Sequence, residues 1–89
     1  MVKSSKASKA PDLPLLHYLN DLSALIKEQA LKAKVNRDKS RGSHSEQYQT
    51  GYLDAYYSVV SLMQQQAIAF QISLESINLN GIDPDKELV

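Results

Sequence analysis

The stretch GYLDAYYSVVSLMQQQAIAF, residues 51–70, decides the fold of this chain. It holds a single charged residue, Asp54, among four aromatic rings and many aliphatic groups. Its large apolar residues recur every three or four positions, which is the period of an α-helix. They fall into two adjacent rows, the first Tyr48, Tyr52, Ala55, Val59, Leu62 and Gln66, the second Leu53, Tyr56, Val60, Met63, Ala67 and Phe70. The stretch therefore predicts a helix over about residues 46–71 with an apolar surface wider than the roughly 100° stripe of an ordinary surface helix.

A second amphipathic helix is predicted upstream, over about residues 13–38. Asp12 is a suitable N-cap, and Pro14 falls in the first turn, where its missing N–H costs little. Glu28 and Lys32 form a favourable pair one helical turn apart. The apolar face of this helix comprises Leu15, Leu19, Leu22, Ile26, Ala30 and Ala33.

The connection is short, KSRGSHS at residues 39–45, and its serines and Gly42 are typical of a turn. Either Ser43 or Ser45 can cap the following helix, and Ser43 with Glu46 has the spacing of a capping box. Two long helices joined this way lie antiparallel. We expect the small residues Ala30 and Ala33 to face the large rings of Tyr48 and Tyr52.

The two ends of the chain differ in composition from the hairpin. Residues 1–11 are basic and poor in apolar groups, so we expect a disordered tail. Ser73 is placed to cap a short helix over Leu74–Asn78, whose apolar residues would fold back on the hairpin. Residues 83–89 are acidic, and we expect them to be mobile. The prediction is an all-α antiparallel helical hairpin with a short C-terminal helix, a single domain over residues 12–82.

The width of the apolar surface on the second helix predicts self-association. A hairpin covers one stripe of each helix, and a large uncovered apolar patch usually marks an interaction site. The chain has no cysteine, so disulfides cannot reinforce so small a core. We expect a homodimer that forms a four-helix bundle, with an interface of Tyr52, Tyr56, Val59, Val60 and Met63. Gly51 either permits a close helix crossing or lies in a frayed first turn.

Charge suggests a second hypothesis. The net charge is zero, but residues 1–45 carry nine basic against four acidic residues, and residues 46–89 carry one against six. The halves can attract each other, or the basic half can contact phosphates. The candidate nucleic-acid contacts are Lys32, Lys34, Arg37, Lys39 and Arg41. A solvated helix end, where cations suit the helix dipole, also accounts for them and is the interpretation we favour.

Catalytic and metal-binding patterns are not found in the sequence. His17 and His44 are expected at opposite ends of the hairpin, and no phosphate-binding or metalloprotease motif is present. No cofactor is expected. No segment has the roughly 20 apolar residues of a membrane span, so we expect no membrane contact and a cytoplasmic location. The sequence predicts a non-enzymatic, self-associating interaction or regulatory module with a possible protein partner. The alternative is a nucleic-acid-binding accessory protein that uses the basic loop end.

Overall fold

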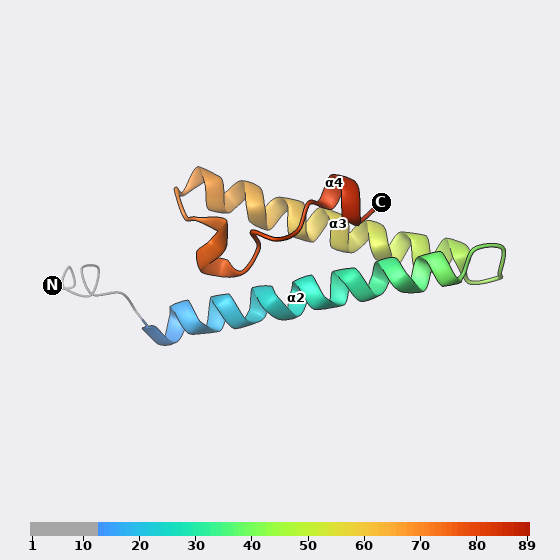
Figure 1. Ribbon diagram of the computed structural model, residues 1–89, viewed down its shortest axis with the longest axis horizontal. Coiled ribbons are helices and arrows are strands. Elements are labelled where there is room, and N and C mark those ends of the chain that lie inside the picture. Colours follow the sequence, from blue (N-terminus) through green and yellow to red (C-terminus); the bar gives the residue numbers. More distant parts are fainter. Residues whose placement is uncertain (1–12) are drawn as a thin grey trace, which may run out of the picture.

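The computed structural model describes residues 13–89, and every regular element among them is helical. Two long helices, α2 (Leu13–Lys39) and α3 (Glu46–Ala69), lie side by side and antiparallel (Figure 1). A short 3₁₀ helix, η1 (Leu74–Ile77), and a one-turn helix, α4 (Pro84–Glu87), follow. The predicted all-α hairpin with a short additional helix is confirmed. The basic tail and the Asp12 cap lie outside the described residues.

The core forms where small residues of α2 meet larger residues of α3. Ala30 and Ala33 of α2 are buried, as are Leu53 and Val60 of α3. Small residues opposite large ones let the helices approach closely and leave few voids. The remaining buried apolar residues are Ala67, Ile77, Leu79, Ile82 and Leu88.

The rotation of α3 differs from the prediction. Tyr48 and Tyr52, which we expected to face the alanines of α2, are 69% and 41% exposed. The neighbouring row, with Leu53 and Val60, faces inward instead. The C-terminal segment packs against both α2 and α3. The side of α3 that carries Leu53 and Val60 therefore faces both α2 and this segment.

Two residues expected in the core lie at its margin. Leu15 is 59% exposed and Phe70 is 71% exposed. Leu15 lies in the first turn of α2 and Phe70 directly follows α3, so both belong to the end of the hairpin that is remote from the connection.

The connection does not form the predicted capping box. Ser45 is the N-cap of α3 but its side chain accepts no capping hydrogen bond. Gly42 adopts a positive φ of 80°, a conformation that glycine takes at little cost. In this conformation the Gly42 N–H donates to Oε1 of Glu46 at 2.9 Å. Glu46 therefore closes the loop rather than capping its own helix.

The chain turns back on the hairpin after α3, as predicted. Ser73 caps η1 by accepting from the Ser76 N–H at 3.2 Å. Asn78 ends η1 in the left-handed region and donates to Asn20 Oδ1 of α2 at 2.9 Å. Gln64 of α3 donates to the Leu79 and Ile82 carbonyl oxygens at 3.1 and 2.9 Å. These bonds attach the segment to both long helices.

Residues 83–89 pack on the hairpin, where we predicted a mobile acidic end. Asp83 caps α4 and Pro84 occupies its first turn, a pairing that favours helix initiation. The Leu88 side chain is fully buried. The carbonyl oxygen of Val89 accepts from Lys34 and, at 2.8 Å, from Arg37 Nη2. One buried leucine and two hydrogen bonds to the Val89 carbonyl oxygen hold this segment against the hairpin.

Ser23 should respond to substitution because its hydroxyl is buried without a hydrogen-bond partner among the described residues. An unpaired buried hydroxyl costs about 1–3 kcal/mol. Ser23→Ala should therefore raise the free energy of unfolding in urea titrations. The control is Ser58→Ala at an exposed position of α3, which gains only helix propensity, about 0.5 kcal/mol. Equal gains for the two variants would contradict an unpaired Ser23 hydroxyl.

Candidate self-association surface

The C-terminal segment covers only one of the two broad sides of the hairpin. Its polar contacts go to Asn20, Lys34 and Arg37 of α2 and to Tyr57 and Gln64 of α3. Asn20 and Lys34 are two heptads apart and Tyr57 and Gln64 are one heptad apart, so each of these two pairs lies on one side of its helix. Among residues 13–89, no segment packs in this way on the opposite side of the two helices. We call this the open face, and it comprises Leu15, Tyr18, Leu22 and Leu25 of α2 and Tyr48, Tyr52, Val59 and Leu62 of α3.

The open face is apolar and largely exposed. Of its eight members only Leu22 is half-buried, whereas Tyr18, Tyr48 and Leu62 are at least 60% exposed. Four exposed charged residues of α2 lie beside this face: Asp21, Glu28, Lys32 and Lys39. Asp54 of α3 falls on the outer strip of its helix and is exposed there. A patch this apolar on a small chain is characteristic of a protein interface.

Aromatic stacking orders the α3 part of the open face. The Tyr48 and Tyr52 rings stack with centroids 6.1 Å apart and planes 16° apart. Tyr52 meets Tyr56 edge-on, with centroids 5.5 Å apart. Burial, and then the neighbouring Tyr52 hydroxyl, raise the pKa of Tyr56. Ordered rings present a large contact area with little entropy left to lose on binding.

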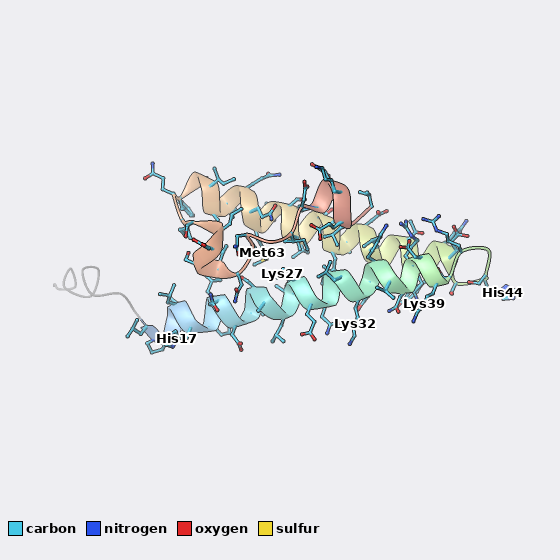
Figure 2. All side chains as sticks on the ribbon, viewed as in Figure 1. His17, Lys27, Lys32, Lys39, His44 and Met63 are labelled. Carbon is cyan, nitrogen blue, oxygen red and sulfur yellow. The ribbon has the colours of Figure 1, made fainter. Side chains whose placement is uncertain are left out.

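A shallow apolar groove extends this surface at the end of the hairpin remote from the connection. It has a volume of about 190 Å³, and Leu19, Met63, Phe70, Ile72 and Ile77 contribute to its walls. Figure 2 shows Met63 between the two long helices. The groove joins residues of α2, α3 and the segment that follows α3.

The predicted interface residues divide between surface and core. Tyr52 and Val59 lie on the open face. Tyr56 and Met63 are half-buried at its border, and Val60 is fully buried in the hairpin core. Tyr48 and Leu62 were not among the predicted interface residues, although they share a row with Tyr52 and Val59. Leu15 and Leu22 were predicted to lie in the hairpin core, so the α2 half of the surface was missed.

Gly51 lies within α3, on an exposed part of the helix. A Cβ atom at this position would meet nothing within 4 Å in the single chain. A close crossing, one of the two alternatives predicted for Gly51, is therefore not made with α2.

The basic cluster is largely occupied by contacts within the chain. Asp38 accepts from Arg37 Nε at 3.1 Å and from Arg41 Nη2 at 3.4 Å, and Lys34 Nζ is 3.6 Å from its other oxygen. Lys34 and Arg37 also hold the Val89 carbonyl oxygen. Partial desolvation would raise the pKa of Asp38, but the Arg37 hydrogen bond and the surrounding cations outweigh it and lower that pKa.

Two cations of the cluster remain available. Lys32 and Lys39 are exposed and make no hydrogen bond or ion pair within residues 13–89. Both extend from the side of α2 that faces away from α3 (Figure 2). The structure thus separates the five predicted phosphate contacts into three engaged residues and two free ones.

The histidines and acidic residues form no metal-binding cluster in the described part of the chain. His17 and His44 lie at opposite ends of the hairpin (Figure 2). Within residues 13–89 no three His, Asp or Glu side chains gather as a metal site would require. None of the helices in this range has the length and apolar character needed to cross a membrane.

The fold and the open face define a small helical-hairpin protein with an uncovered apolar surface. Comparison of the chain with protein-family models, curated proteins and solved structures gives no match. Its function is therefore inferred from its own residues.

Tyr57 provides a pH-dependent test of the α3–α4 contact. Its hydroxyl donates to Asp85 of α4, and this hydrogen bond, followed by the Asp85 charge, raises the pKa of Tyr57. Because the folded pKa is the higher one, the contact stabilises the fold fully below the unfolded pKa, about 10. That stabilisation is lost as pH rises through the folded pKa.

We expect alkaline absorbance titration to show a late-titrating tyrosine that Asp85→Asn shifts to lower pH. Tyr57→Phe should remove this transition and reduce the alkaline loss of stability. A titration curve unchanged by Asp85→Asn would contradict the hydrogen bond.

Proposed function

We propose that this chain is a non-enzymatic interaction module that functions as a homodimer. Two hairpins would pack their open faces together and form a four-helix bundle. The observation that supports this most is the open face itself, an apolar surface on both long helices that the C-terminal segment leaves uncovered.

A second copy is a suitable occupant of this surface for two reasons. The apolar residues of the open face carry no charge, so a twofold axis brings no like charges together at its centre. A chain of 89 residues without cysteine has a small core, and small domains commonly gain stability by association. Dimerisation would bury the exposed tyrosines and leucines that water now contacts.

The dimer could present its remaining surface to a protein partner, which is the regulatory role we predict from the sequence. The nucleic-acid alternative remains a prediction, carried by Lys32 and Lys39. It has less support because Asp38 and Val89 engage the other three cations.

The proposal is tested by thermal unfolding at several protein concentrations. Association with the folded state makes the unfolding midpoint rise with concentration. We expect such a rise over a hundredfold dilution series, followed by circular dichroism. A midpoint independent of concentration, together with a one-chain mass, would overturn the proposal.

A further inference from the structure

Four exposed charges follow one side of α2 beside the open face. Asp21, Glu28, Lys32 and Lys39 lie within about 40° of one another around the helix. None of them makes a hydrogen bond or ion pair with another residue in the range 13–89, and the predicted Glu28–Lys32 pair does not form. Four unpaired charged side chains along one side of α2 are therefore available to contact a partner.

Their order along α2 is self-complementary. The two acids precede residue 30 and the two bases follow it at the same distances. If a second α2 lies antiparallel with residue 30 opposite residue 30, Asp21 faces Lys39 of the second copy. Glu28 then faces Lys32 of the second copy, and Leu25 faces its Val35. A parallel contact between two α2 helices would instead place like charges opposite each other, which is unfavourable.

The open-face row of α3 points to the same arrangement independently. An antiparallel copy centred midway between Tyr52 and Ala55 places each Tyr52 ring opposite the small Ala55 side chain. Tyr48 then faces Val59 of the second copy. Large-to-small layers of this kind are what close helix packing requires.

The α2 centre and the α3 centre lie at nearly the same level along the long axis of the hairpin. The connection joins Lys39 to Glu46, so residue 30 of α2 lies level with residue 55 of α3. The α3 centre differs from this level by one to two residues, or about 2 Å of helix rise. One twofold axis, perpendicular to the helices, therefore satisfies both rows.

We infer that two copies associate antiparallel through their open faces, with the loops at opposite ends of the bundle and the twofold axis at Ala30. This inference rests on the proposed self-association and adds its orientation. The charge row of α2 selects the orientation, and the apolar face supplies the buried area.

Single cysteines distinguish the orientations, because the natural chain has none. Gln29 and Asn36 are exposed, lie one heptad apart and occupy the same side of α2. In the antiparallel dimer, Gln29→Cys lies about 3 Å along the axis from its counterpart, whereas Asn36→Cys lies about 18 Å from its own. A disulfide needs Cα atoms within about 7 Å.

We expect mild oxidation to cross-link Gln29→Cys and to leave Asn36→Cys monomeric on a denaturing gel. Cross-linking of both variants would show two α2 helices in parallel register, which would overturn the inferred orientation while leaving self-association intact. If neither variant cross-links and the wild-type chain is monomeric in solution, the proposed function fails with it. If neither cross-links although the wild type is a dimer, only the inferred axis is wrong.

Charge reversal provides a second readout. Glu28→Lys should weaken the dimer roughly tenfold, since two attractive pairs become repulsive. The double variant Glu28→Lys with Lys32→Glu should restore wild-type affinity. Equal dissociation constants for wild type and Glu28→Lys would contradict the inferred pairing.

Discussion

Val59→Glu is expected to produce a folded monomer. Val59 lies in the middle of the open face of α3 and is 40% exposed in the single chain. A glutamate there remains in water when the hairpin is alone, but in the dimer it would be buried among the apolar groups of both copies. Burying an unpaired carboxylate costs several kcal/mol, and the twofold axis doubles that cost. We expect the dissociation constant to rise by at least about a thousandfold, with helicity by circular dichroism unchanged.

The matched control for this variant is Ile68→Glu. Ile68 belongs to the same helix and is 66% exposed, but it lies on the side of α3 near Gln64 and Pro84. This charge should leave both the fold and the association state unchanged. A dimer that survives Val59→Glu, or one that Ile68→Glu breaks, would contradict the assignment of the interface to the open face.

Val60→Glu is expected to unfold the chain, although Val60 is the immediate neighbour of Val59. The Val60 side chain of α3 is fully buried in the core formed by the two long helices and the C-terminal segment. A carboxylate at that position has no partner and no access to water, which costs several kcal/mol. The core of a domain this small supplies only about 3–5 kcal/mol of net stability. We expect the helical circular dichroism signal to collapse at neutral pH.

The variants Val59→Glu and Val60→Glu together distinguish the core from the interface. If Val60→Glu gave a monomer with wild-type helicity, Val60 would belong to the interface rather than to the core. The rotation of α3 described above would then be wrong.

The hairpin could be predicted from sequence because its signals are local. The three-to-four residue spacing of apolar groups fixes the helical period, and Gly42 with its serines marks the connection. The Ser73 cap was recognisable for the same reason, since a serine hydroxyl and the N–H three residues later interact within one turn. These features depend on residues close together in the chain.

The rotation of α3 could not be predicted because it depends on contacts between distant segments. The two apolar rows are similar in composition, and which one faces α2 depends on where residues 78–89 pack. Gln64 and Tyr57 make those contacts, and neither residue signals them in the sequence. The packing of Leu88 was missed because a single leucine in an acidic end carries no periodic pattern.

The candidate surface was predicted in part. The excess apolar width of α3 correctly indicated an uncovered strip in the single chain, and Tyr52 and Val59 lie on it. Val60 was assigned to the same strip because adjacent rows cannot be separated without the helix rotation. The contribution of α2 was missed because Leu15 and Leu22 have the spacing of core residues.

Self-association through the open face underlies the other inferences drawn for this chain. It can be measured by sedimentation velocity of the unmodified protein at low and moderate salt, with absorbance followed in the nucleic-acid and tyrosine bands. We expect one species with twice the mass of the 9.9 kDa chain at both salt concentrations, without excess nucleic-acid absorbance. A one-chain mass at every concentration would rule out self-association, and a heavier, salt-sensitive species rich in nucleic-acid absorbance would move the functional site to Lys32 and Lys39.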